Sequence, residues 1–161
     1  MVLSDSKAYF DTSAVLNIIS DSIELVNYSL SNFNVYPDSN GIQVLKFVIK
    51  NNQILNDTIV SMIIRKTVSN NGIDTVFVYS DNGNGVYDAA DTELANSAFP
   101  GNTVSMNINY IIGSLSSKLF FVTVHLSKTL TDGDTFDFEI PANSLYLMSG
   151  LTRPATSFNS S

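Results

Sequence analysis

The chain has no cysteine and only one histidine among its 161 residues. The absence of cysteine excludes a disulfide framework, a zinc–thiolate site and a cysteine nucleophile. Stability must therefore come from packing, from strand pairing and from any bound metal. The single histidine, His125, excludes a histidine-rich metal centre, and any serine–histidine–aspartate arrangement would have to use it.

Positive charge is also scarce: the chain has eight Lys and Arg residues against 15 Asp and Glu residues, which gives a formal charge of −7. The basic residues are not clustered, so nucleic acid is not an expected partner. No apolar run approaches the ~20 residues of a membrane-spanning helix. Residues 1–6 lack the basic and apolar regions of an export signal. The sequence therefore predicts either a cytosolic protein or a mature exported chain that has lost its signal.

The composition favours the exported alternative. Hydrophobic residues make up 44% of the chain and charged residues only 14%, so the surface of a folded domain would be neutral and polar. The length predicts one domain over residues 1–161. Three acceptor sequons, at Asn27, Asn56 and Asn159, are typical of an extracellular or cell-surface glycoprotein. In a chain so rich in Asn and Ser, sequons also arise by chance.

Apolar residues recur with period two, which indicates an all-β protein. Eight to nine short strands separated by turn residues favour a single β-sandwich, immunoglobulin-like or jelly-roll-like, over a barrel. The clearest strands are expected at Ile42–Lys50, Thr58–Val68, Asp74–Ser80, Val104–Tyr110, Phe120–Leu126, Phe136–Ile140 and Ser144–Met148.

The alternation also predicts which side chains face the core. The expected inner rows are Leu45, Phe47, Ile49; Val60, Met62, Ile64; Val104, Met106, Ile108, Tyr110; Phe120, Val122, Val124, Leu126; and Phe136, Phe138, Ile140. Phe121, Thr123 and His125 are expected to face away from the core. Asp74–Ser80 is apolar on both faces, which predicts a covered central strand.

Both ends of the chain depart from this pattern. Ala8–Ser20 is apolar but follows neither the helical nor the strand period. Residues 1–20 are therefore expected to supply either a strand exchanged with another molecule or the domain's own first strand. Thr152–Ser161 is polar enough to predict a loose tail.

The most informative stretch is Ser80–Glu93, which spaces oxygen ligands as a looped calcium site does. In a twelve-residue calcium loop, ligands come from the first, third, fifth, ninth and twelfth positions, the seventh gives a backbone carbonyl, and the sixth is glycine. Counting from Ser80 puts Gly85 at the sixth position. The predicted metal ligands are Ser80 or Asp81 as the first, then Asn82, Asn84, Val86, Asp88 and Asp91, with Glu93 as a spare acid.

The run from Asn82 to Asp91 resembles the calcium loops of dockerin-like and thrombospondin-type repeats, and those of many bacterial and archaeal surface proteins. This resemblance covers about a dozen residues and implies an EF-hand-like loop that binds Ca²⁺ in an extracellular protein. The same loop occurs on many folds, so the resemblance implies no particular activity. A solvated Asn-Gly hairpin is the alternative, although a plain turn needs neither Asp88 nor Asp91 at these offsets.

Other candidate sites are less specific. Asp137 and Glu139 share one face of a strand, as paired catalytic acids do, but solvent-facing strand residues have the same spacing. His125 lacks a flanking glycine–serine elbow. Aromatic residues could stack on sugar rings, but core and loop packing is their commoner role. The aromatic residues considered are Tyr9, Tyr28, Phe33, Tyr36 and Tyr87.

These features predict a non-enzymatic extracellular structural subunit, stabilised by calcium and belonging to a surface filament, layer or adhesin-type protein. The small size suggests many copies, so the expected partners are further copies in a homopolymer, joined by β-strand addition, or other surface proteins. The alternative is a calcium-dependent carbohydrate- or protein-binding module of a larger secreted protein.

Overall fold

The structure is a computed structural model that describes residues 22–31, 34–68 and 72–160. The predicted exchangeable segment Ala8–Ser20 lies outside these residues. The described part of the chain contains eleven strands, and no helix in it is long and apolar enough to span a membrane. The strands are β1 (Ile23–Asn27), β2 (Ile42–Asn51), β3 (Asp57–Lys66), β4 (Ile73–Ser80), β5 (Thr92–Ala98), β6 (Thr103–Ile112), β7 (Ser116–Leu126), β8 (Phe138–Ile140), β9 (Leu145–Leu147), β10 (Thr152–Arg153) and β11 (Phe158–Asn159).

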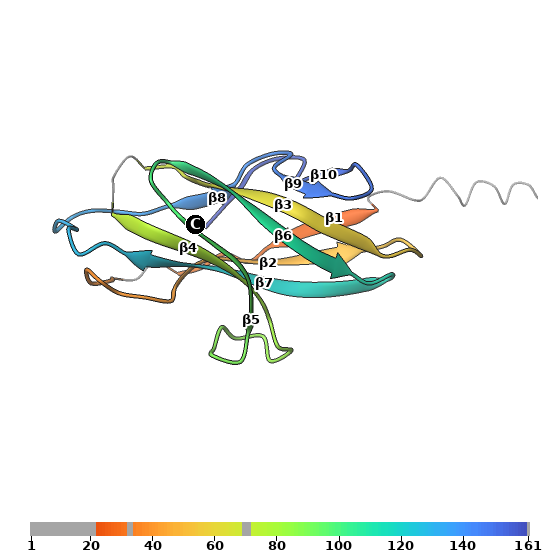
Figure 1. The fold of residues 1–161 in the computed structure, drawn as a ribbon, viewed down its shortest axis with the longest axis horizontal. Coiled ribbons are helices and arrows are strands. Elements are labelled where there is room, and N and C mark those ends of the chain that lie inside the picture. The colour runs from red at the N-terminus through yellow and green to blue at the C-terminus, as the bar shows by residue number, and fades with distance from the viewer. Residues whose placement is uncertain (1–21, 32–33, 69–71, 161) are drawn as a thin grey trace, which may run out of the picture.

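The strands form two antiparallel sheets that pack face to face, as Figure 1 shows, which confirms the predicted β-sandwich. The first sheet is five-stranded with the order β1-β2-β7-β4-β5. The second is six-stranded: β3 pairs with β6 on one side, and β9 and β8 share its other side, flanked by β10 and β11. The strand β4 lies between β7 and β5, so the prediction that it is central is confirmed.

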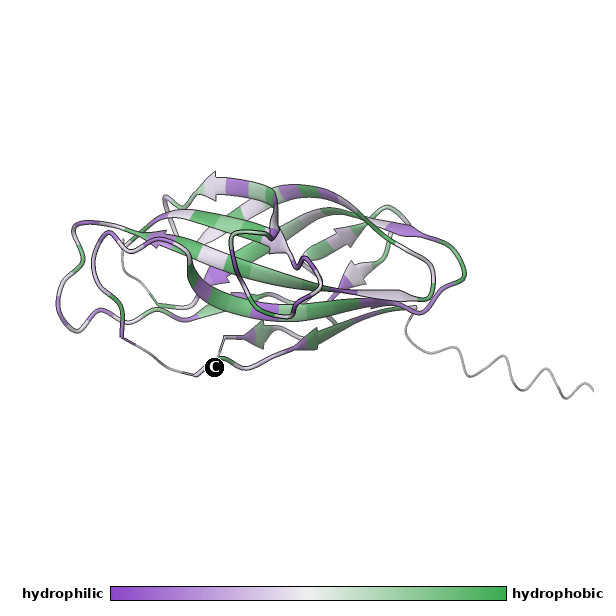
Figure 2. Ribbon diagram, turned by 90° about the horizontal axis from the view of Figure 1, so that it is seen from below, coloured by the Kyte–Doolittle hydropathy of each residue, from purple (hydrophilic) through white to green (hydrophobic). Residues whose placement is uncertain are grey.

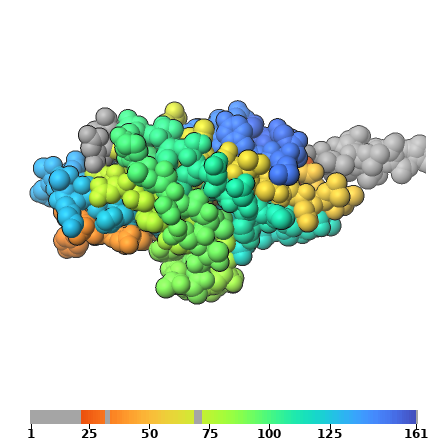
Figure 3. Space-filling model, viewed as in Figure 1, coloured from red at the N-terminus to blue at the C-terminus, as the bar shows by residue number. Residues whose placement is uncertain are grey.

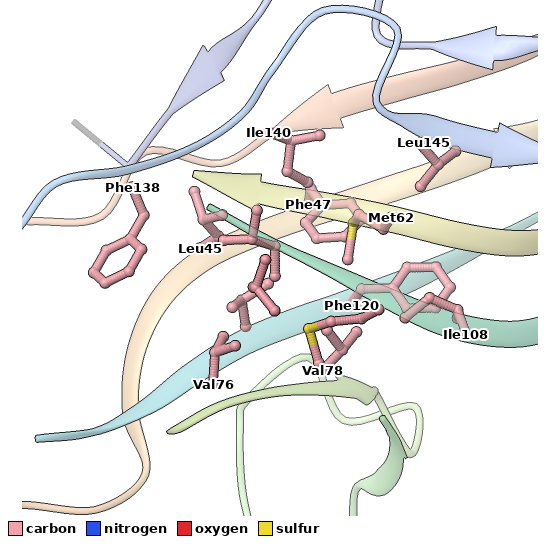
Figure 4. Packing of buried hydrophobic residues seen from close by; sticks show 14 of the residues in the cluster. Leu45, Phe47, Met62, Val76, Val78, Ile108, Phe120, Phe138, Ile140 and Leu145 are labelled. Carbon is pink, nitrogen blue, oxygen red and sulfur yellow. The ribbon is translucent and has the colours of Figure 1, made fainter. Parts of the chain in front are cut away.

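An aromatic cluster joins the inner faces of the two sheets, and Figure 4 shows two of its rings, Phe47 and Phe120, within the buried core. Phe47 on β2 stacks on Phe120 of β7 with ring centroids 5.5 Å apart, and Tyr110 of β6 meets the Phe120 ring edge-on at 5.4 Å. Phe158 of β11 lies 5.8 Å from Phe47. Because these rings come from both sheets, they link β2 and β7 to β6 and β11 through buried apolar surface.

Most predicted inner rows are confirmed. The rows of β2, β6 and β7 are buried except for the half-buried Tyr110, and on the β8 row Phe138 and Ile140 are buried while Phe136 is half-buried. Figure 2 shows the alternation of hydrophobic and hydrophilic residues along several strands. In β3 the prediction was wrong at one position: Ile59 is buried and Val60 is not, because the register shifts between Ile59 and Ser61. Such a β-bulge reverses the facing of the residues before it.

Three segments that the pattern did not predict as strands pair with a neighbouring strand, and the first of them is β1, which pairs with β2. Thr92–Ala98 forms β5, an edge strand whose small polar residues give little apolar alternation. The expected loose tail contains β10, which pairs with β9, and β11, which pairs with β8. Phe158 packs against the core cluster, and this contact explains why the polar tail is fixed to the sandwich.

Truncation of the aromatic cluster should strongly destabilise the domain. We expect Phe120→Ala to lower the free energy of unfolding by about 3–5 kcal/mol, because it removes a fully buried ring and leaves a cavity between the sheets. Urea unfolding followed by circular dichroism measures this change. Tyr146→Ala on β9, where the ring is half exposed, is the control and should cost less than about 1 kcal/mol. Equal losses in the two variants would contradict the assigned core.

Candidate functional site

The predicted calcium loop connects β4 to β5 and projects from the first sheet, as Figures 1 and 3 show. Its base is fixed by strand pairing, because Ser80 at the end of β4 lies opposite Thr92 at the start of β5. Ser80 also lies opposite Phe120 on β7, and its side chain is buried. Both ends of the loop are therefore held by the sheet.

The carboxylate of Asp81 closes the first half of the loop. It is buried, and its two oxygens accept hydrogen bonds from the backbone N–H groups of Gly83 at 2.8 Å and Gly85 at 2.9 Å. Both glycines have positive φ, +116° and +79°, which favours glycine at these turns. Gly85, the sixth residue of the predicted loop, therefore adopts a backbone conformation that favours glycine.

The second half of the loop folds around two further carboxylates. Asp91 accepts the backbone N–H of Asn82 at 2.8 Å and that of Asp88 at 3.0 Å, which joins the start of the loop to its end. Asp88 accepts the backbone N–H of Ala90 at 2.7 Å and the side-chain amide of Asn84 at 2.6 Å. The loop is thus organised by acidic oxygens that point toward its own backbone and amide groups.

Two asparagines make local turns between these acids. The Oδ1 of Asn82 accepts the N–H of Asn84 at 2.9 Å, and the Oδ1 of Asn84 accepts the N–H of Val86 at 2.8 Å. These successive Asx turns wind the chain tightly from Asn82 to Val86. Carboxylate or amide oxygens of Asp81, Asn82, Asn84, Asp88 and Asp91 therefore all take part in one hydrogen-bonded loop.

Hydrogen bonding changes the electrostatics of Asp88. The N–H of Ala90 and the side-chain amides of Asn84 and Asn82 lower the pKa of the Asp88 carboxyl from its ordinary value, because they stabilise the charged form. The Asp88 carboxylate therefore remains ionised, and available as a ligand or acceptor, at more acidic pH than an isolated aspartate.

Side chains of the first sheet anchor the loop. The Nζ of Lys46 on β2 donates to the carbonyl oxygen of Gly85 at 2.8 Å and lies 5.6 Å from the ring centroid of Phe121. Tyr87 contacts both Phe121, at 5.8 Å between centroids, and Tyr79, at 5.1 Å. Burial, together with Tyr87 and Glu93, raises the pKa of Tyr79 above its usual range. These contacts join the outer face of the sheet to the loop.

Lys46 and Phe121 contact the loop although the sequence pattern did not predict it. Phe121 was expected to face away from the core, and it does face outward, but it is fully buried. Tyr87 and Lys46 lie against its ring. The available signal was the run Leu119–Val122, whose apolar residues on both faces indicate a strand covered on both sides.

Of the predicted ligands, Ser80 and Glu93 lie on the flanking strands β4 and β5, outside the loop network. Glu93 lies on β5, where its carboxylate accepts hydrogen bonds from the hydroxyl of Tyr79 at 3.3 Å and from the side-chain amide of Asn96 at 2.8 Å. Asp81, by contrast, reaches into the loop through both carboxylate oxygens. In this geometry Asp81 is better placed than Ser80 to supply the first ligand oxygen.

The chemistry of the donors suits calcium, which takes carboxylate, amide and backbone carbonyl oxygens. In the described part of the chain, no three Asp, Glu or His side chains gather closely enough to form a metal-binding group by themselves. A calcium ion would therefore need the amide oxygens of Asn82 and Asn84 and the carbonyl of Val86 beside the acids. The Asn84 side chain would ligate through its Oδ1, while its nitrogen donates to Asp88.

The other candidate residues have separate partners. Glu139 is buried and ion-paired with Arg65, whereas Asp137 accepts hydrogen bonds from the hydroxyls of Thr67 and Ser160. His125 lies 3.4 Å from the carboxylate of Asp38. Each group is therefore held by its own neighbour, and none of these contacts joins either acid to the histidine.

The sequon asparagines and the candidate aromatics differ in exposure. The side-chain nitrogen of Asn27 donates to the backbone oxygen of Asn159 at 2.9 Å, so this nitrogen is already engaged with the C-terminal strand. Asn56 and Asn159 are exposed. Tyr28 and Tyr36 are exposed as well, whereas Tyr87 is half-buried against the sheet; Tyr9 and Phe33 lie outside the described residues.

Comparison with known proteins gives no family for the chain: no protein-family model and no curated protein matches it.

The lowered pKa of Asp88 predicts how the loop responds to acid. A carboxyl with a depressed pKa in the folded state contributes stability above its unfolded pKa of ~3.9, and this contribution is lost as the pH falls through the folded value. We therefore expect NMR titration to place the midpoint of Asp88 below ~3.9. Asn84→Ala should raise this midpoint because it removes one donor. A midpoint at or above the ordinary value in the parent chain would contradict the assigned hydrogen bonds.

Proposed function

We propose that this chain is a non-enzymatic extracellular structural subunit: a calcium-stabilised β-sandwich of a surface filament, layer or adhesin-type protein, which assembles with further copies of itself. The observation that carries the proposal is the β4–β5 loop. It gathers five oxygen-bearing side chains, from Asp81 to Asp91, on a rigid sheet. Calcium bound in this loop would stabilise the folded domain.

The expected effect of calcium is moderate. Extracellular modules bind calcium with a Kd of ~0.1–1 mM. At ~1 mM free calcium the tighter limit adds about 1.4 kcal/mol to the stability of the folded state. This is a useful part of the ~5–15 kcal/mol that separates folded from unfolded domains. Calcium in the loop would also order an exposed segment, which is where proteolysis concentrates.

Calcium should raise the melting temperature of the parent chain by roughly 3–6 °C over the value in excess chelator. This shift should vanish in an Asp88→Ala, Asp91→Ala double variant, which removes two ligands. Differential scanning calorimetry at matched ionic strength measures both chains. An Asp74→Ala, Asp132→Ala variant removes the same charge from two exposed acids elsewhere and should keep the shift.

Glu93→Ala should also keep the calcium shift, because Glu93 contacts Tyr79 and Asn96 outside the loop network. Calcium binding at this loop would be disproved by a parent chain without a shift, or by a double variant that retains it.

Assembly of copies is tested by removal of residues 1–20. The buried core described above comes from Ile23 onward. We therefore expect the shortened chain to keep its circular dichroism spectrum and cooperative unfolding but to lose the filaments or oligomers of the full chain. Electron microscopy and analytical ultracentrifugation measure assembly. A shortened chain that no longer folds would instead show that the segment is the domain's own first strand.

A calcium-dependent binding module for carbohydrate or protein is the second candidate function. It is favoured by a groove of about 1060 Å³ whose lining includes the exposed ring of Tyr36. Ligand sites have volumes of about 300–1,000 Å³, and an exposed tyrosine can stack on a sugar ring. A glycan array on which binding requires calcium would favour this function, whereas uniformly negative arrays would count against it.

A further inference from the structure

The groove lies at the end of the sandwich that carries the β1–β2 and β7–β8 loops. Residues of both sheets line it. Val124 and Leu126 of β7 and Phe138 of β8 are buried, whereas Leu130 and Phe136 of the β7–β8 loop are half-buried. The groove therefore exposes the end of the hydrophobic core.

The same groove borders an open stretch of sheet edge. The ladder between β1 and β2 ends at Asn27 opposite Phe47, followed by one bond from the N–H of Tyr28 to the oxygen of Lys46. The chain then crosses to the other sheet, where the N–H of Leu30 donates to the oxygen of Ser160. Among the described strands, none pairs with the outer side of residues 42–45. Their peptide groups are available to an added strand.

The opposite end of the sandwich carries the start of β1 and exposed apolar side chains. There the oxygen of Ser22 accepts the N–H of Asn52, so the described chain begins at this end of the sandwich. Three large apolar side chains are exposed in the adjoining β2–β3 and β6–β7 loops: Ile54 (82%), Leu55 (70%) and Leu115 (70%). Figure 1 shows these two loops at the end opposite the β7–β8 loop.

The N-terminal segment is long enough to fill the groove of a neighbouring molecule. β2 has ten residues, so about 30 Å separates Ser22 from the groove of the same copy. In the next copy of a head-to-tail row, the groove would face Ser22 directly. Residues 8–20 span at most ~43 Å as a strand, and Asp11 is their only charged residue.

We propose that the groove and the open edge at Ile42–Leu45 receive the segment Ala8–Ser20 of a second copy as an added strand. This inference rests on the self-assembly proposed above and identifies where the partner binds. Main-chain hydrogen bonds to β2 would hold the donated strand, and its apolar side chains would fill the groove. Because donor and acceptor lie at opposite ends, the contact is heterologous and does not close, so copies add to form a linear filament.

Engineered cysteines in full-length chains test this contact, since the parent chain has no cysteine. Two populations with different affinity tags are mixed, one carrying Ile18→Cys in the segment and the other Val35→Cys at the groove. After mild oxidation in calcium buffer we expect disulfide-linked dimers that contain both tags. The control replaces Val35→Cys with Tyr146→Cys, on the outer face of the second sheet, and should give at least tenfold fewer mixed dimers.

A variant of the groove provides the second measurement. Leu130→Asp places a carboxylate where the donated strand would bury apolar groups, which is unfavourable without a partner. We expect the concentration needed for assembly to rise at least tenfold, with the melting temperature changed by only a few degrees because Leu130 lies in a loop and is half-exposed. Tyr146→Asp is the matched control and should assemble like the parent chain.

The outcomes separate the two proposals. The parent chain could form filaments without giving Ile18–Val35 cross-links, or Leu130→Asp could assemble normally. Either result would overturn the groove as acceptor while leaving self-assembly intact. A chain carrying both Ile18→Cys and Val35→Cys that cross-links within single molecules would show that the segment fills its own groove, which also overturns the proposal. A parent chain that never assembles would contradict the proposed function itself.

Discussion

The packing of the two inner faces around Phe120 is the contact on which the rest of the structure depends. Its strand, β7, pairs with both β2 and β4, and its ring meets Phe47 from its own sheet and Tyr110 from the other. The β4–β5 loop and the groove both contact β7. The β4–β5 loop begins opposite Phe120 at Ser80, and the groove at the end of the sandwich has Val124 and Leu126 of the same strand in its lining. A rigid β7 thus fixes the positions of both.

The outer face of the first sheet gives the loop a second support. Loops are usually mobile because few buried contacts hold them, but this loop has Tyr87 packed on Phe121 and the carbonyl of Gly85 bonded to Lys46. Its acidic side chains are consequently preorganised by backbone donors. Preorganisation lowers the entropy cost of binding an ion, while the hydrogen bonds already made by the acids compete with it. In the calcium role proposed above, these two effects oppose each other.

The two ends of the sandwich are chemically different, and this difference gives the molecule a direction. One end has a groove into the core beside an unpaired stretch of β2, and the other exposes Ile54, Leu55 and Leu115 beside the start of β1. Exposed apolar groups and open strand edges carry a risk of uncontrolled association. In a molecule that assembles head to tail, both are covered by the neighbouring copy.

The sequence by itself determined the sandwich class and the inner rows of β2, β6 and β7, because the alternation of apolar and polar residues is a local property of the chain. It did not determine the facing of Val60, the pairing of Thr92–Ala98 or the attachment of the polar tail. The bulge in β3 decided the facing of Val60, pairing with the edge of β4 decided the strand at Thr92–Ala98, and the contact of Phe158 with Phe47 fixed the tail. Each of these depends on residues far apart in the chain. The same holds for the candidate site: spacing selected Asp88 and Asp91, but only the tertiary structure showed that Asp81 enters the loop, that Glu93 stays outside it and that Lys46 and Phe121 anchor it.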